Sequence, residues 1–209
     1  LLTFTTICDG ITTLPFIENF DLYTGSTSGT VNNLPTCWNN LSGTYSSYVG
    51  YPIIYNSATY AQSGSNSLRF YTGTTTSYDY GNQYAILPMI DASVHPLSTL
   101  QINMDVRKYS TSYADFTLIV GVMGNATDAS TFIPVDTISE ASTTYNNYTV
   151  YFNNYSGPEG RIALLAPKFT PSGVAYNEGH VDNIIIDVIP NCPPPADLQA
   201  VSVTTNSVT

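Results

Sequence analysis

Hydrophobic and polar residues alternate along two segments of the chain, strictly at residues 101–107 and again at residues 146–153. A period of two places successive side chains on opposite faces of a β-strand, so both segments predict half-buried strands. Other segments are nearly continuous apolar runs, typical of strands covered on both faces: residues 115–123, 161–167 and 181–189. Shorter candidates raise the total to ten or eleven strands: residues 16–21, 37–40, 53–60, 67–71, 84–87 and 132–138.

Clusters of Gly, Pro, Asn, Ser and Thr separate these candidate strands, and they mark turns: residues 72–81, 124–130, 153–160 and 171–179. Helical periodicity is nearly absent from the sequence. Many short strands with regular turn spacing and no helices favour a sandwich or a barrel. We therefore expect an all-β fold, with the apolar faces of two packed sheets forming the core.

The two ends of the chain differ from this body. Residues 1–12 lack the basic start and the apolar stretch of a signal peptide, so we interpret them as an incoming linker. The body then spans residues 13–190. Residues 191–209 begin with a stiff Pro-rich stretch and end in an alternating segment that resembles the opening strand of a fibronectin type III domain. That resemblance implies a modular parent protein with flanking domains in the same chain.

Charge narrows the classes of partner. The chain has 15 acidic and 5 basic residues, a formal net charge of −10. Nucleic-acid backbones and anionic membrane surfaces need clustered Lys and Arg, so neither is an expected partner. No apolar run is long enough to insert into a membrane. The 17 tyrosines and the low charged fraction are typical of exported β-proteins. The acid surplus favours divalent cations, or it simply keeps the protein soluble.

Three cysteines, Cys8, Cys37 and Cys192, are present, and none has the spacing of a zinc site. An odd count in an exported protein leaves at least one thiol without a partner in the chain. Cys8 and Cys192 flank the body, so a disulfide between them can join its two ends. Cys37 precedes the only tryptophan and is interpreted as a small buried residue.

An ordered series of short motifs carries a family resemblance: LPFIENFD at residues 14–21, LPTCW at 34–38, SGSNSLRF at 63–70, YAILPMI at 84–90 and VDNIII at 181–186. The series resembles the MAM-like jelly-roll modules of Bacteroidetes surface proteins. These include the cleaved-adhesin domains of gingipain-type haemagglutinins and the choice-of-anchor modules. The resemblance implies a jelly-roll sandwich of two antiparallel sheets that is secreted or displayed at the cell surface. It also implies roles in adhesion or carbohydrate binding.

The same resemblance implies a structural calcium ion where the first strand meets the last. Calcium takes six to eight oxygen ligands from carboxylates and carbonyls. Glu18 and Asp182 have apolar neighbours along the chain, and an isolated carboxylate is costly to bury there. The alternative is that both simply point outward or pair with Arg69 or Arg161. The family pattern assigns Glu18, Ser65, Asn66 and Asp182 as ligands, with Asp21 and Asn183 as weaker candidates.

Catalytic signatures are missing from the sequence, which has no nucleophile elbow, zinc-protease motif or phosphate loop. His180 and Asp182 lie two apart on one expected strand, so they face the same way. An acid–base pair can arise there, but a local hydrogen bond is the simpler interpretation. We therefore expect no enzymatic activity.

Tyrosines cluster in two stretches that contain turn signals. Exposed tyrosines on the loops of a rigid sandwich can stack on sugar faces or grip a protein partner, unless they pack on the sheets. The candidate ligand-binding residues are Tyr45, Tyr48, Tyr51, Tyr78 and Tyr80.

These observations favour a non-catalytic, exported adhesion module that binds a glycan or a host or other extracellular protein and contains structural calcium. A structural spacer beside a catalytic domain of a larger secreted enzyme is the alternative. A glycan-active enzyme is a third hypothesis, which the abundance of acidic residues cannot test.

Overall fold

The computed structural model describes residues 8–29, 32–42, 51–73, 81–169, 176–191, 203–204 and 207–208. Short 3-10 helices, Leu97–Thr99 and Ala129–Thr131, interrupt an otherwise all-β chain. The strands, numbered in chain order, are β1 (Phe16–Glu18), β2 (Asn39–Ser42), β3 (Ile53–Asn56), β4 (Asn66–Gly73), β5 (Gln83–Ile86), β6 (Leu100–Lys108), β7 (Phe116–Met123), β8 (Phe132–Glu140), β9 (Asn146–Tyr151), β10 (Arg161–Ala166), β11 (Tyr176–Val188), β12 (Val203–Thr204) and β13 (Ser207–Val208).

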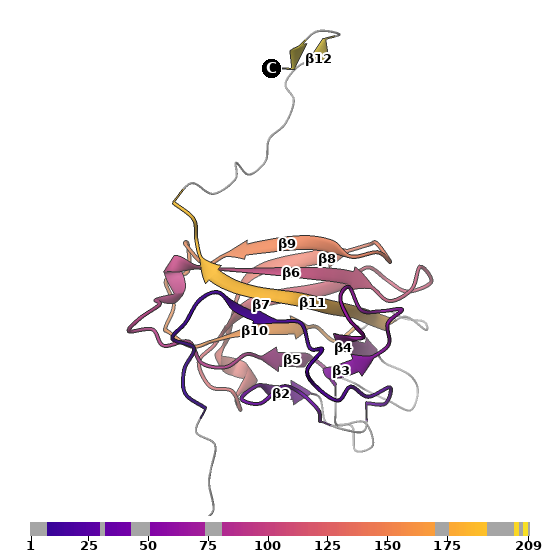
Figure 1. Cartoon of the computed structure of the whole chain (residues 1–209), viewed down its shortest axis with the longest axis horizontal. Helices are drawn as coiled ribbons and strands as arrows, with labels where there is room; N and C mark the ends of the chain where they lie inside the picture. Colours follow the sequence, from indigo (N-terminus) through magenta and orange to yellow (C-terminus); the bar gives the residue numbers. More distant parts are fainter. Residues whose placement is uncertain are drawn as a thin grey trace, which may run out of the picture.

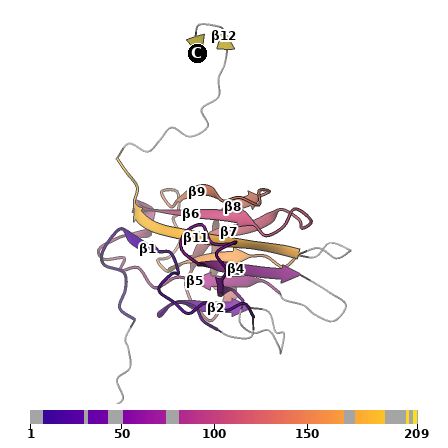
Figure 2. The same cartoon turned by 45° about the vertical axis from the view of Figure 1, so that its right-hand side comes forward.

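Eleven of these strands form two antiparallel sheets that stack as layers (Figures 1 and 2). The front sheet has the order β3-β4-β11-β6-β9, and β1 pairs with the second half of β11. The back sheet has the order β2-β5-β10-β7-β8. The outer strands β8 and β9 belong to different sheets and lie beside each other at one side of the sandwich. The predicted all-β jelly-roll sandwich of two antiparallel sheets is confirmed, as is the expected number of strands.

Alternation in the sequence explains which side chains reach the core. Along β6, Ile102, Met104 and Val106 are fully buried, whereas the residues between them are partly exposed on the outer face of the front sheet. The apolar run of β7 is largely buried because alternate side chains from Phe116 to Val122 enter the main core, while Met123 packs in a second apolar cluster with Tyr84 and Ile86. Large aromatic side chains fill the space between the sheets, among them Phe20, Phe70, Phe116, Phe152 and Trp38.

One strand begins earlier than the sequence predicts. β11 starts at Tyr176, within the segment interpreted as a turn, rather than at Val181. The early part is polar, but each polar side chain finds a partner on a neighbouring element: Asn177 bonds to the backbone of Thr117, and Glu178 pairs with Arg69. Because these partners come from distant parts of the sequence, the local pattern gives no sign of the strand.

Two further segments differ from the expected strands. β3 ends at Asn56 because the chain turns there, with the amides of Tyr60 and Ala61 both bonded to the carbonyl of Ser57. In the C-terminal segment, β12 pairs with β13, so two very short strands replace one continuous strand. Among the described residues, no helix has the length and apolar character needed to cross a bilayer.

The Cys8–Cys192 disulfide, which the sequence allows as one possibility, is not formed, because Cys8 is bonded to Cys37. Their Cα atoms are 5.5 Å apart although they are separated by 29 positions in the sequence. Cys37 is therefore not a free, buried thiol; it is partly exposed, with a φ of 71°. Cys192 lies outside the described residues. The bond attaches the segment before β1 to the segment that leads into β2.

Reducing this disulfide is expected to lower the free energy of unfolding by about 3 kcal/mol, because the closed loop restricts the unfolded chain. Peptide mapping of the unreduced protein checks the pairing, and thermal unfolding with and without a reductant checks the stabilisation. A Cys8–Cys192 peptide in the map, or identical unfolding curves, would contradict the assignment.

Candidate functional site

The outer face of the front sheet carries an unusual set of polar and aromatic side chains. On β4, Leu68 and Phe70 point into the core, so Ser67, Arg69 and Tyr71 point outward. The register aligns Arg69 with His180 of β11. Side chains from distant segments of the chain therefore meet on one face.

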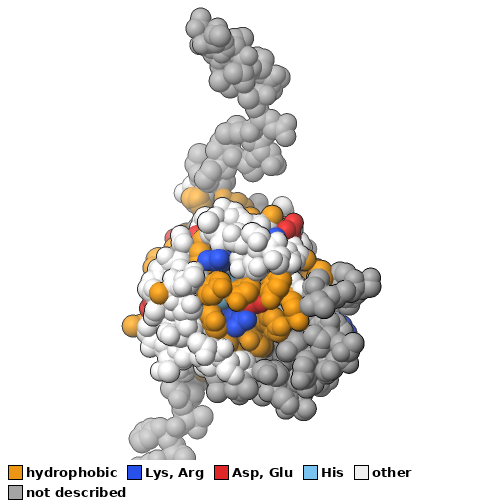
Figure 3. Space-filling model, turned by 90° about the vertical axis from the view of Figure 1, so that its right-hand side faces the viewer, with side chains coloured by type: hydrophobic (Ala, Val, Ile, Leu, Met, Phe, Trp, Pro, Cys, Tyr) orange, Lys and Arg blue, Asp and Glu red, His pale blue; other side chains and the backbone are white. Residues whose placement is uncertain are grey.

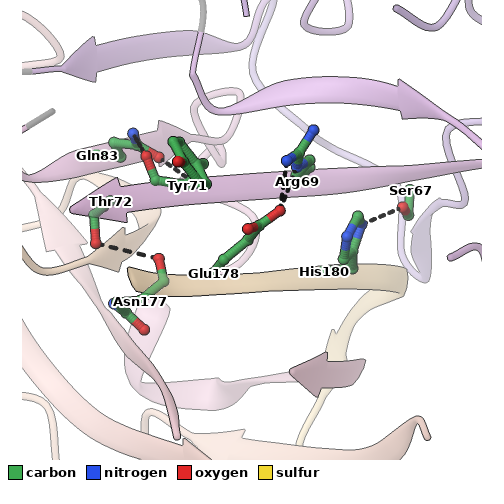
Figure 4. Close-up of polar contacts among 8 residues, drawn as sticks. All are labelled: Ser67, Arg69, Tyr71, Thr72, Gln83, Asn177, Glu178 and His180. Carbon is green, nitrogen blue, oxygen red and sulfur yellow. Dashed lines mark hydrogen bonds and ion pairs between the residues drawn. The ribbon is translucent and has the colours of Figure 1, made fainter. Parts of the chain in front are cut away.

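An ion pair between Arg69 and Glu178 lies at the centre of this face (Figure 4). The Arg69 Nε atom donates to Glu178 Oε1 at 2.8 Å, and Nη2 is 2.5 Å from the same oxygen. The arginine side chain is 12% exposed and the glutamate side chain 1%. Both groups are thus nearly removed from water, and each depends on the other for compensation of its charge.

Burial controls the protonation of this pair. Loss of solvent raises the pKa of Glu178 to about 7, and Arg69 only partly offsets the rise. Burial also opposes the charge of Arg69, but the attraction of Glu178, its hydrogen bond and nearby tyrosines together raise the pKa of the guanidinium. Perturbed titratable pairs in a concave surface are candidates for functional sites.

Seven tyrosines surround the pair, and we call them the tyrosine cluster. Neighbouring members contact one another with centroid distances between 4.8 and 6.0 Å. The Cζ atom of Arg69 lies 4.6 Å from one ring centroid and 5.5 Å from three others, which is within cation–π range. The members are Tyr51, Tyr55, Tyr60, Tyr71, Tyr109, Tyr113 and Tyr176.

The surface is hollowed over the ion pair. This hollow has a volume of about 330 Å³. Figure 3 shows a face of the molecule on which orange side chains, tyrosine included, gather around basic and acidic atoms. The hollow has aromatic walls and one charged pair, and its lining residues are Thr27, Tyr51, Arg69, Tyr71, Tyr109, Tyr113 and Glu178.

His180 lies beside the hollow and is fully buried. Its Nδ1 atom is 2.9 Å from Ser67 Oγ, and its ring stacks on Tyr60 at a centroid distance of 5.0 Å. Its Nε2 atom has no hydrogen-bond partner in the described part of the chain. Burial, followed by the charges of Arg69 and Arg107, lowers the pKa of His180 well below its usual range. The imidazole is therefore neutral, and it is bonded to Ser67 rather than to Asp182.

Of the five predicted ligand-binding tyrosines, Tyr51 lines the hollow, and Tyr45, Tyr48, Tyr78 and Tyr80 lie outside the described residues. The other lining side chains were not predicted as a site. Arg69, Tyr71 and Glu178 occupy outward positions on two strands, and Tyr109 and Tyr113 follow β6. The alternating pattern of each strand could have shown that these side chains point outward, but the sequence alone does not show that the two strands are neighbours.

The predicted calcium ligands lie where β1 meets β11 and the loop before β4. Glu18, at the end of β1, accepts hydrogen bonds from the Phe20 amide at 2.7 Å and the Tyr23 hydroxyl at 3.2 Å. Asp182 accepts from the amides of Gln62 and Ser63 at 2.8 and 3.1 Å.

A second carboxylate holds the other end of the same loop. Asp21 accepts from the amides of Ser65 and Asn66 at 2.9 and 3.3 Å, so these two residues lie against Asp21 and not Asp182. The Asn66 side chain donates to the carbonyls of Phe20 and Tyr23. Asn183 lies at a bulge with a φ of 50°, and its side chain accepts from the hydroxyl of Ser63.

Electrostatics around this loop are unfavourable for the acids. Burial raises the pKa of Glu18, and it raises that of Asp182 to about 6; the charge of Asp21 adds to both shifts. Within the described ranges, none of the three forms an ion pair with a basic side chain. The described residues contain no group of three or more His, Cys, Asp or Glu side chains that could hold a metal ion.

Comparison with solved structures shows which fold this is. The chain is similar to the K1 cleaved adhesin domain of Lys-gingipain from Porphyromonas gingivalis W83, with a TM-score of 0.55 and 15% identity, over 84% of this chain and 99% of that domain. The chain is also similar to the K2 cleaved adhesin domain of Lys-gingipain, with a TM-score of 0.55 and 14% identity, over 83% of this chain and 99% of that domain. No protein-family model and no curated protein matches the sequence. At this identity the likeness shows a shared fold, that of an adhesin-like β-sandwich.

Proposed function

We propose that this chain is a non-catalytic, exported binding module that takes a glycan in the hollow of the front sheet. The observation that carries the proposal is the hollow itself, with tyrosine walls around Arg69 and Glu178. Sites for small ligands are typically concave and mostly apolar, with a few polar groups that fix orientation. Secretion or display at the cell surface follows from the exported character of the composition and supports the same role.

Sugars suit this combination of side chains. The C–H face of a pyranose packs against an aromatic ring, and its hydroxyls need both donors and acceptors. The hollow offers both, over a volume of about 330 Å³. A specific protein partner usually covers about 800 Å² on each side, far more than this hollow provides. The geometry therefore favours a glycan over a host or other extracellular protein.

One feature supports the alternative role as a structural spacer. The members of the tyrosine cluster already contact one another, and Arg69 already fills the space between four of them. Such packing can brace the sheet without any ligand. The two roles make different predictions for glycan binding.

A glycan array, followed by calorimetry on any ligand found, separates the two roles. Tyr109→Ala is expected to weaken binding by about 10-fold or more, since it removes one aromatic wall. Tyr151→Ala is the matched control, because Tyr151 projects from the same face of the front sheet but does not line the hollow. Absence of binding to any glycan would favour the spacer. Binding that is lost in the Tyr151 variant alone would place the ligand elsewhere.

The loop between β3 and β4 supports a second proposal, a structural calcium ion. Asp21 and Asp182 accept hydrogen bonds from backbone amides of this loop, and the charge of Asp21 acts on Glu18 at the end of β1, but the three carboxylates do not form a group that could hold a metal as they stand. None of the three has a basic partner among the described residues. A divalent cation would relieve their repulsion. Carboxylates combined with backbone oxygens are the ligands that calcium prefers. The carboxylates would supply the charge, and oxygens of Ser65 and Asn66 would complete the set. When bound, the ion would join β1, the loop and β11 mechanically.

A further inference from the structure

The ion pair in the hollow leaves one donor and one acceptor open. Arg69 directs both Nε and Nη2 to a single oxygen of Glu178, Oε1. No described residue accepts a hydrogen bond from Arg69 Nη1, and none donates to Glu178 Oε2. Neither atom is among the fully buried polar atoms without a partner, so each keeps some exposed surface, which is small for Glu178, whose side chain is 1% exposed.

The open donor and acceptor are held in place. Salt-bridge contacts fix the arginine and glutamate head groups against each other, and four tyrosine rings fix the guanidinium. A group that is ordered before binding loses little further entropy when a ligand arrives. Two polar atoms of opposite character in fixed positions match a pair of neighbouring hydroxyls on a sugar ring, because each hydroxyl both donates and accepts.

We infer that the hollow takes an uncharged sugar and that Arg69 and Glu178 read two neighbouring hydroxyls, Arg69 Nη1 donating to one and Glu178 accepting from the other. This inference rests on the proposed function and names the class of ligand. The charges of Arg69 and Glu178 compensate each other, so the described residues that line the hollow present no uncompensated charge that would select an ion.

Charged ligands fit this hollow less well. An acidic sugar would bring its carboxylate beside Glu178, which already lacks solvent, on a protein with a net charge of −10. A cationic ligand would need free aromatic faces, but Arg69 already lies over those of Tyr51, Tyr71 and Tyr109. Selection against charge thus comes from the same side chains that read the hydroxyls.

Paired oligosaccharides test this inference in the full chain. Calorimetry would compare β-1,4-linked mannan with mannuronan fragments and α-1,4-linked galactose oligosaccharides with galacturonan fragments, because each pair then differs only by a carboxylate at C6. We expect a neutral member to bind and its uronate partner to bind at least about 10-fold more weakly. Glu178→Gln and Arg69→Lys are each expected to weaken neutral binding by about 10- to 100-fold, the usual effect of losing a hydrogen bond to a charged group.

Glu140→Gln is the matched control, since Glu140 is equally buried but does not line the hollow, and its variant should bind like the wild type. Near-ultraviolet circular dichroism confirms that each variant is folded; if one is not, the paired ligands on the wild type still decide. Tighter binding of uronates, or neutral binding that both variants retain, would overturn the inference while leaving glycan binding intact. Failure of every glycan to bind would overturn the proposed function as well.

Discussion

Replacing Arg69 with methionine is expected to lower the free energy of unfolding by about 2–3 kcal/mol at about pH 8, because buried Glu178 must then keep an unpaired charge or take up a proton, and because the cation–π contacts of the guanidinium are lost. The side chain of Glu178 is 1% exposed, so water cannot compensate for the lost guanidinium. Methionine keeps much of the arginine stem and therefore limits the loss of packing. Chemical unfolding followed by circular dichroism measures the change.

Two variants isolate the cause of this loss. Arg107→Met is the matched control, because Arg107 also lies over tyrosine rings but forms no ion pair among the described residues. It should be destabilised by less than about 1 kcal/mol. The double variant Arg69→Met with Glu178→Met should recover much of the stability, since it removes both charges. Equal losses in the two arginine variants would show that burial of Glu178 is not the cause.

The pH dependence of the Arg69 variant has a definite sign. Glu178 has a folded-state pKa of about 7, above its usual value of 4.5, and loss of Arg69 raises it further. A raised pKa means that the folded state binds a proton more tightly than the unfolded state. In the wild type, the stability that protonated Glu178 contributes is therefore complete below about pH 4.5 and is lost as the pH rises to about 7, whereas in the variant the loss continues above pH 7. The defect of Arg69→Met should shrink at about pH 5; a constant defect would contradict this account.

Calcium at a thousandfold excess over its Kd is expected to stabilise the protein by about 4 kcal/mol, since it binds only the folded state. Thermal unfolding with calcium and with EDTA measures the effect. Asp182→Ala should abolish it, because Asp182 is one of three carboxylates at the proposed site. Asp187→Ala, on the same strand but outside that group, should leave the calcium response unchanged. Superimposable curves for the wild type would remove the calcium proposal.

Protons and calcium should compete at this site. Without calcium, the raised pKa values of Glu18 and Asp182 mean that these two groups favour the folded state most at acidic pH, and the contribution of Asp182 is lost as the pH rises through about 6. Calcium needs ionised carboxylates, so its stabilising effect should grow over the same range. A calcium effect that is larger at about pH 5 than at about pH 7 would contradict the assignment of these ligands.

The fold follows from local patterns in the sequence, but parts of its topology do not. Period-two alternation predicts β6 and β9, and apolar runs predict β7, β10 and the later part of β11. Four of the first five residues of β11 have polar side chains, and the partners of Asn177 and Glu178 lie on β7 and β4 respectively. The Cys8–Cys37 bond likewise depends on how two loops meet in space. Such contacts appear only when strand order is known.

The candidate site was predictable to a similar degree. Tyr51 was recognised as a tyrosine near a turn, and it lines the hollow. Arg69 and Glu178 are separated by 109 positions, and either one alone looks like an ordinary surface charge. Their significance arises because they are buried on neighbouring strands, where loss of solvent raises the pKa of Glu178 and tyrosines pack around the pair. Pairing of β4 with β11 creates the site, and that pairing is a tertiary property.

The side-chain NMR signal of Arg69 tests the central claim most directly. The chain contains only three arginines, so its Nε–Hε resonances can be assigned readily. The Nε–Hε group of Arg69 donates a hydrogen bond to Glu178 in the hollow. If a glycan occupies the hollow, titration with a neutral oligosaccharide should shift the Arg69 resonance in a saturable manner and leave that of Arg161 unchanged. A bound glycan that leaves the Arg69 resonance unmoved would contradict this account of the site.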